Sequence, residues 1–193
     1  MKPTGFGTPH TVARLVLDTS EVIEWSKFPD KYRELRYLVE QFSVSLARCD
    51  VVDTELDSPK NEMVDGYFLA SVPYLELHGP VVLGHSRLNH SVAASENDVQ
   101  RLDRVKEIVV VRSDSERNQM HDLRDSMHIA TSIRYGYDGL ITNDGRLLKR
   151  GETFVSEFGF RIFNVDTAVK YVRSLIRKQE LRNQLGQGLI TEC

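Results

Sequence analysis

Two short strand-like runs in this chain end directly at an aspartate, and this feature constrains the fold more than any other. Residues 15–17 run into Asp18, and residues 139–143 run into Asp144. Runs of this kind are typical of strands buried in a parallel sheet, where ligands bind beyond the carboxyl ends of the strands. A third carboxylate, Asp125, stands at the start of a helical pattern. We expect the three carboxylates to converge, which predicts a divalent metal site.

The rest of the sequence alternates between strand and helix patterns. The first strand is predicted at 14–17, and a loop and then a helix are predicted to follow it. Further strands are predicted at 43–47 and 160–165. Helices are predicted at 35–42, at 51–56 with Asp50 as its cap, and from Ser95 to residue 108. A further helix is predicted to start between residues 122 and 125 and to end at Gly136, and the last helix is predicted to follow Asp166 as its cap. This alternation predicts an α/β fold with a central parallel sheet between two helical layers.

The chain length and the positions of proline and glycine predict one domain with an elaboration. A chain of 193 residues is long enough for a single α/β domain with a sizeable core. We expect residues 1–13 to form an N-terminal tail and residues 14–193 to form the domain. Prolines and glycines interrupt every periodic run at about 57–94, so this stretch is predicted to be an elaboration.

Composition excludes several classes of protein. The two cysteines match neither a redox motif nor a zinc-ligand spacing, which is compatible with a reducing compartment. No apolar run is long enough to span a bilayer and the first residues lack a secretion-signal core, so we expect a soluble cytoplasmic protein. A formal net charge of −3 provides no general attraction to polyanions, so any nucleic acid would need a local basic surface.

Three segments together resemble one known family. Residues 124–144 read RDSMHIATSIRYGYDGLITND and contain D-x-x-H-x-A-T, a glycine and T-N-D. These elements resemble the C-terminal signature of PIN-domain nucleases. Residues 15–20, reading LVLDTS, resemble that family's opening strand, in which an aspartate followed closely by Ser or Thr provides the first active-site carboxylate. Residues 49–56 are similar to the early helix that contributes a glutamate, and this similarity makes Glu55 the second carboxylate.

The resemblance implies a PIN-like fold and a metal-dependent endoribonuclease. In that family, residues at the positions of Asp18, Glu55, Asp125 and Asp144 would hold one or two Mg²⁺ or Mn²⁺ ions, and the products would carry a 5′-phosphate and a 3′-hydroxyl. The implied setting is a toxin of a toxin-antitoxin pair. The implied substrate is RNA, and an antitoxin protein and a homo-oligomer stay open as partners.

The chemistry of these side chains agrees with a hard cation. Mg²⁺ and Mn²⁺ prefer carboxylate and water oxygens, and the short side chain of aspartate holds an oxygen rigidly. Several carboxylates in one pocket repel each other unless a cation lies between them, so without metal some would have raised pKa values. Each aspartate also has a plainer role, because all three stand where turns or helix starts favour an acid.

Several supporting residues have alternative interpretations. Glu55 competes with Asp53 and Asp57 for the second-carboxylate position. Ser20 could orient Asp18, and Asn143 could reach a metal-bound water or cap the next turn. The hydroxyl of Thr142 could also orient a carboxylate or a metal-bound water, but we favour its satisfying local backbone groups.

Two further side-chain assignments stay open. His128 lies one turn after Asp125, where a packed histidine is a commoner outcome than a catalytic one. The basic residues Arg146, Lys149 and Arg150 could contact phosphates or form a solvated helix face.

Two other classes of protein compete with the nuclease. A non-catalytic RNA-binding or scaffold module would keep the fold without turnover. A phosphotransferase would use Asp18 as a covalent nucleophile, because an aspartyl nucleophile also follows a buried strand. Against this second class, Ser20 occupies the position at which a D-x-D motif needs its second aspartate.

Overall fold

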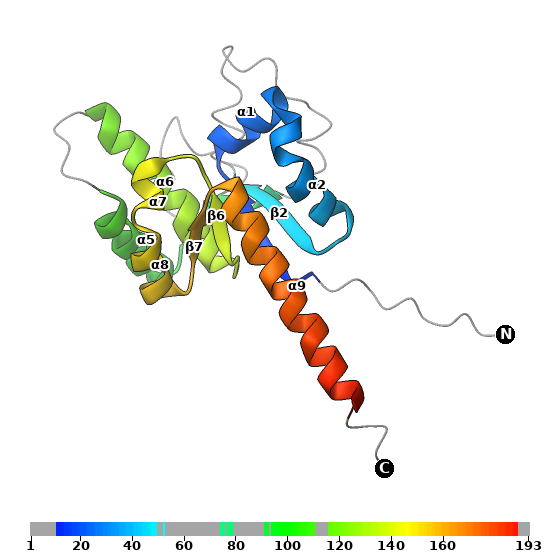
Figure 1. Ribbon diagram of the computed structural model, residues 1–193. Helices are drawn as coiled ribbons and strands as arrows, with labels where there is room; N and C mark the ends of the chain where they lie inside the picture. Colours follow the sequence, from blue (N-terminus) through cyan, green and yellow to red (C-terminus); the bar gives the residue numbers. More distant parts are fainter. Residues whose placement is uncertain are drawn as a thin grey trace.

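A parallel β-sheet forms the centre of the protein. The structure is a computed structural model that describes residues 11–49, 52, 74–75, 77–78, 91–92, 94–110 and 116–188. The sheet has the strand order β3-β2-β1-β6-β7, and every pairing in it is parallel (Figure 1). Its strands are β1 (Ala13–Leu17), β2 (Val44–Cys49), β3 (Tyr74–Leu75), β6 (Gly139–Ile141) and β7 (Arg161–Phe163). The predicted α/β fold with a central parallel sheet is confirmed.

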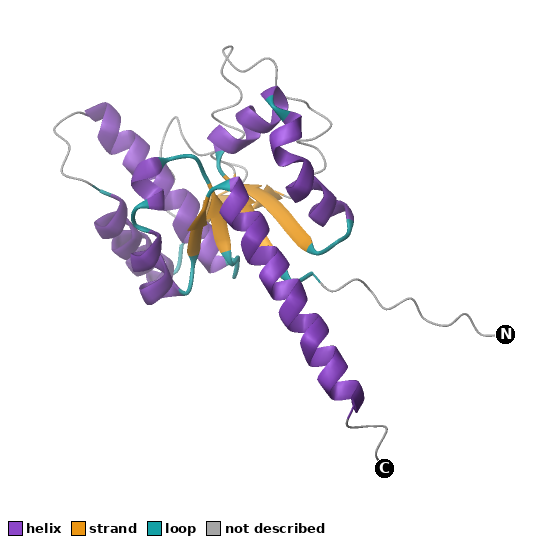
Figure 2. Cartoon of the chain, viewed as in Figure 1, coloured by secondary structure: helices purple, strands orange, loops and turns teal. Residues whose placement is uncertain are grey.

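Helices cover both faces of this sheet (Figure 2). One layer contains α1 (Thr19–Lys27), the 3-10 turn η1 (Pro29–Tyr32), α2 (Arg33–Glu40) and α9 (Val165–Gly188). The other layer contains α5 (Glu96–Val109), α6 (Glu116–Arg134), α7 (Gly145–Leu148) and α8 (Gly151–Phe158). A separate small sheet pairs β4 (Leu77–His78) with β5 (Ser91–Val92) in parallel.

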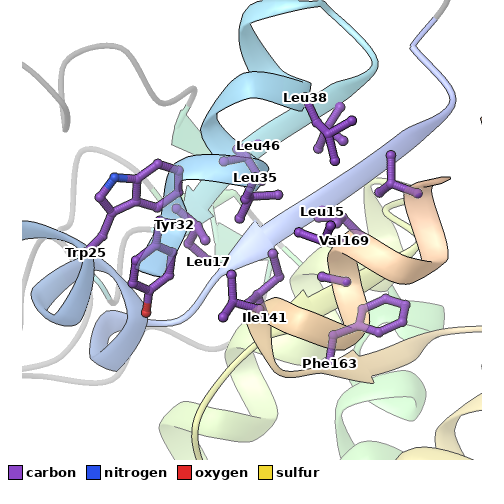
Figure 3. Packing of buried hydrophobic residues seen from close by; sticks show 14 of the residues in the cluster. Leu15, Leu17, Trp25, Tyr32, Leu35, Leu38, Leu46, Ile141, Phe163 and Val169 are labelled. Atoms are coloured by element: carbon purple, nitrogen blue, oxygen red, sulfur yellow. The ribbon is translucent and has the colours of Figure 1, made fainter. Parts of the chain in front are cut away.

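Alternation along β1 divides the core into two parts. Leu15 and Leu17 point into the layer of α1, α2 and α9, whereas Val16 points into the layer of α5 to α8. Figure 3 shows the first of these clusters, in which the rings of Trp25 and Tyr32 stack with their centroids 4.8 Å apart. All three β1 residues are fully buried, so the strand is apolar on both faces, as its sequence predicts.

The chain order reverses around β1, which creates the switch point of the sheet. Strand β2 lies on one side of β1 and β6 lies on the other. In register, Leu17 pairs with Ile141, and the backbone N–H of Asp18 donates to the Ile141 carbonyl at 3.0 Å. The residues that follow β1 and β6 therefore emerge side by side, at the place where open α/β sheets bind ligands.

Two of the predicted helix boundaries are confirmed. Ser95 caps α5 and forms a reciprocal capping box with Asp98, as the sequence indicates. Gly136 has a φ of 69°, so it supplies the left-handed conformation that follows the last turn of α6.

The predicted cap of the last helix is wrong. We expected Asp166 to begin this helix, but α9 begins at Val165 and Asp166 lies in its first turn. The cap is Asn164, whose Oδ1 accepts a hydrogen bond from the Thr167 backbone N–H at 2.9 Å. Asn and Asp serve as caps about equally well, so the local sequence alone favours neither.

The predicted loop after Asp18 is also wrong, because residues 19–27 form α1. This helix is short and carries only two buried apolar side chains, Val22 and Trp25, spaced by three residues. So short a pattern is a weak helical signal, and α1 depends on packing against the sheet.

Other predictions concern the middle of the chain. The predicted strand at 43–47 is confirmed as β2, which extends to Cys49. The Asp50 cap, most of the helix at 51–56 and most of the elaboration at 57–94 lie outside the described residues. Within the described part of the chain, no helix is both long enough and apolar enough to cross a membrane.

Gly139 is the glycine that the sheet requires most clearly. A Cβ atom at this position would lie 2.5 Å from the Arg161 carbonyl oxygen and 2.7 Å from the ring of Phe163. Since backbone cannot move aside cheaply, Gly139→Ala should lower the free energy of unfolding by about 1–3 kcal/mol. Chemical denaturation measures this, with Gly145→Ala as the control because a Cβ there meets no atom within 4 Å. Equal stability of both variants would show that the close approach of β6 and β7 does not require a glycine at residue 139.

Candidate functional site

Acidic side chains gather at the switch point between β1 and β6. Asp18 follows β1 directly, and Asp144 follows β6 after two residues. Helix α6 packs on the same region and contributes Asp125 from its middle, because the helix begins at Glu116 and the predicted start at 122–125 is wrong. The structure therefore brings together three of the four predicted carboxylates. The fourth, Glu55, and its alternatives Asp53 and Asp57 lie outside the described residues.

Asp18 is held in one orientation by hydrogen bonds to both carboxylate oxygens. As the N-cap of α1, its Oδ1 accepts from the Thr19 backbone N–H at 2.8 Å. Its Oδ2 accepts from Ser20 Oγ at 2.9 Å and from Thr142 Oγ1 at 2.6 Å. Asp18 therefore caps α1 and takes part in the site at the same time, because the cap uses one carboxylate oxygen and the two hydroxyls bind the other.

Thr142 links the ends of the two strands. Its hydroxyl donates to Asp18 Oδ2, and the same oxygen accepts from the Asp144 backbone N–H at 3.0 Å. We favoured the local backbone contact over the orientation of a carboxylate, and the structure shows both. The reason is the β1–β6 register, which places the buried Thr142 beside Asp18.

Asp144 is tied to Arg146 two residues later. It caps the short helix α7, and its Oδ1 accepts from the Arg146 backbone N–H at 2.6 Å. Its Oδ2 accepts from Arg146 Nη2 at 2.8 Å and from Nε at 3.2 Å. Burial would raise the pKa of Asp144, but these hydrogen bonds and the charge of Arg146 outweigh it and lower that pKa.

Arg146 also reaches across to α6. Its Nη1 lies 2.9 Å from Asp122 Oδ1, and its Nη2 lies 3.5 Å from Asp125 Oδ2. Asp122 is almost fully buried and precedes Asp125 by one helical turn, so both carboxylates lie on one face of α6. We name Asp122, Asp125 and Asp144 the carboxylate cluster. Sequence reasoning missed Asp122, although its spacing from Asp125 was a usable signal.

Asp125 has the most perturbed carboxyl group in this region. Burial, which has the largest effect, and the negative charges of Asp18 and Asp144 together raise its pKa to about 7, although the positive charge of Arg146 partly offsets them. Asp18 and Asp144 therefore lie close enough to Asp125 to repel its charge. A divalent cation between them would relieve that repulsion, so the donor set suits Mg²⁺ or Mn²⁺. Within the described residues, however, no three such side chains already surround a single point as metal ligands.

The remaining predicted side chains lie at the edge of the site. His128 is buried on α6, and its Nδ1 lies 3.9 Å from Asp18 Oδ1, which is too far for a hydrogen bond. Asn143 does not cap the next turn, since that cap is Asp144. Its amide instead donates to Glu24 on α1.

Two acidic residues of α1 adjoin the site and share one hydroxyl. Tyr32 Oη contacts Glu21 Oε2 and lies 2.9 Å from Glu24 Oε2, although a phenol has only one proton to donate. Burial raises the pKa of Glu21, whereas the hydrogen bond from Lys31 lowers the pKa of Glu24. Tyr32 Oη is the donor in both contacts, so its single proton can serve only one of the two carboxylates at a time.

Comparisons with known proteins identify no family. No protein-family model matches the chain, and no curated protein matches it in sequence.

The raised pKa of Asp125 predicts how the metal-free protein responds to pH. An unfolded aspartate titrates near pH 4, so the stability contribution of Asp125 is full below that pH and is lost as the pH rises through about 7. Asp125→Asn removes this loss. In chelator at pH 8 the variant should be more stable than the wild type by about 2 kcal/mol, and at pH 4 the difference should largely vanish.

Urea denaturation at the two pH values measures this difference. The control is Asp103→Asn, whose carboxylate is 64% exposed on α5 and should change stability little at either pH. A wild type as stable as Asp125→Asn at pH 8 would show that the three carboxylates do not repel one another appreciably.

Proposed function

We propose that this protein is a divalent-metal-dependent endoribonuclease in which Asp18, Asp125 and Asp144 hold one or two Mg²⁺ or Mn²⁺ ions. The observation that carries the proposal is the convergence of these three carboxylates at the switch point of a parallel sheet, where Asp18 and Asp144 lie close enough to help raise the pKa of Asp125. The three residues also belong to the segments that resemble the PIN-domain signature. Glu55 enters the proposal as a fourth ligand by that resemblance alone.

The surrounding residues would keep the carboxylates in place for the ion. Ser20, Thr142 and the start of α1 fix the Asp18 carboxylate through hydrogen bonds, so little conformational entropy is left to lose on binding. The helix cap fixes Asp144 in the same way. When bound, the ion would lower the pKa of a water molecule and offset charge on the phosphodiester.

The proposed reaction is hydrolysis of an RNA phosphodiester. The oxygen of a water molecule forms a bond to phosphorus, the bond from phosphorus to the 3′ oxygen breaks, and the leaving oxygen takes up a proton. The products carry a 5′-phosphate and a 3′-hydroxyl. This route requires no covalent enzyme intermediate. The setting that the family resemblance implies is a toxin held by an antitoxin protein, with a homo-oligomer also open.

One observation favours a second candidate, a non-catalytic RNA-binding or scaffold module with the same fold. Arg146 already neutralises part of the carboxylate cluster without any metal. In a module without turnover, this pairing would be permanent and structural. Divalent-metal binding distinguishes the two candidates, because the module has no need of it.

The test is cleavage of labelled RNA by the purified protein in Mn²⁺, in Mg²⁺ and in chelator. Cleavage should require metal, and Asp18→Asn and Asp125→Asn should each reduce it at least about 100-fold, on the scale of losing one electrostatic contribution to the transition state. The matched control is Asp103→Asn, an exposed aspartate on α5 that should retain wild-type activity. Circular dichroism of each variant verifies that the fold is intact.

The outcomes separate the candidates. Cleavage that persists in purified Asp18→Asn would contradict the proposed ligand set. Absence of both cleavage and calorimetric metal binding would favour the non-catalytic module. A covalent phosphate trapped on Asp18 would favour the phosphotransferase instead.

A further inference from the structure

We infer that Arg146 is an internal counter-ion that occupies the carboxylate cluster in the metal-free protein and must release Asp125 and Asp144 when a divalent cation binds. The inference rests on the proposed function, because it concerns the same site. It assigns Arg146 a role in setting metal affinity, as a positioning residue that competes with the ion.

The geometry of the guanidinium group carries this inference. A single nitrogen, Nη2, lies 2.8 Å from Asp144 Oδ2 and 3.5 Å from Asp125 Oδ2. These two oxygens belong to two of the proposed metal ligands. An ion held by both carboxylates would need the space between them, with oxygens at about 2.0–2.1 Å for Mg²⁺. Nη2 fills that space, so guanidinium and ion cannot occupy it together.

Electrostatics leads to the same conclusion. The guanidinium carries one positive charge at any relevant pH, and it would repel a dication among the same carboxylates. The same carboxylate oxygens can bind either a guanidinium group or a hard cation. Arg146 and the ion therefore compete for the same negative charge.

Arg146 can leave the two ligands without leaving the region. Its Nη1 pairs with Asp122, which is buried and is not a proposed metal ligand. Its backbone N–H is held by Asp144 Oδ1, so only the side chain has to rotate. About half of that side chain is already exposed to solvent, at 49%, which leaves an open direction for the movement.

Metal affinity in variants of this residue tests the competition. Binding of Mn²⁺ is measured by the loss of the free-ion electron paramagnetic resonance signal, which does not depend on catalysis. Arg146→Gln should bind Mn²⁺ at least about tenfold more tightly than the wild type. Arg146→Lys keeps the charge but loses the planar fork of the guanidinium, so its Mn²⁺ affinity should lie between those of the wild type and Arg146→Gln.

A matched control removes a positive charge from the same short segment. Lys149 follows α7 directly and is exposed, and in the described part of the chain it forms no ion pair with the carboxylate cluster. Lys149→Gln should change Mn²⁺ affinity by less than about twofold, because the lost charge is not among the ligands. An equal gain in Mn²⁺ affinity in both variants would show that the effect comes from net charge alone, and this would overturn the inference.

A second measurement uses the unmodified protein, because Arg146→Gln leaves Asp122 buried without its cation and could fold poorly. The side-chain Nε–H resonance of Arg146 is assigned by its disappearance in Arg146→Lys. Titration with diamagnetic Mg²⁺ should shift this resonance to a value typical of a solvated guanidinium. A resonance that stays unchanged at saturating Mg²⁺ would overturn the inference.

The results also distinguish this inference from the proposed function. If the wild type binds Mn²⁺ and Arg146→Gln binds it no more tightly, the inference fails and the metal-dependent function stands. If neither protein binds Mn²⁺, both fail. If Arg146→Gln gains affinity and Lys149→Gln does not, both are supported.

Discussion

The parallel pairing of β1 with β6 is the constraint on which the site depends. It sets Leu17 beside Ile141, and the two strand ends then place Thr142 in hydrogen-bond contact with both Asp18 and Asp144. Burial of β1 on both faces keeps the register from slipping, since a one-residue shift would exchange its two apolar faces. The carboxylates are therefore held close together by the packing of the core rather than by any attraction among themselves.

That arrangement has an electrostatic cost, which several features reduce. Hydroxyl and backbone donors stabilise the charge on Asp18, and Arg146 stabilises the charge on Asp144. Asp125 has no comparable donor within the described contacts, and burial beside two acids raises its pKa. Burial also raises the pKa of the neighbouring Glu21, but there a hydrogen bond donated by Tyr32 partly offsets the effect.

Much of the architecture could be predicted from the sequence. The strands around Leu15 and Leu140 were readable because both are continuous apolar runs, and the Ser95 capping box is a local signal. The failures occurred where local signals are weak or equivalent: α1 is short and stabilised by packing, and Asn164 caps as well as Asp166 would. In the site, a contact such as that from Thr142 to Asp18 joins residues whose proximity no local pattern encodes.

By itself, the sequence determined which chemical groups are present and at which strand ends they stand, because periodicity and turn chemistry are local properties. It placed Asp18 and Asp144 after buried strands and Asp125 on a helix. Only the tertiary structure decided that Asp122 joins them and that Arg146 lies among them. The physical reason is that electrostatic balance depends on distances through space, and these are set by sheet register and helix packing.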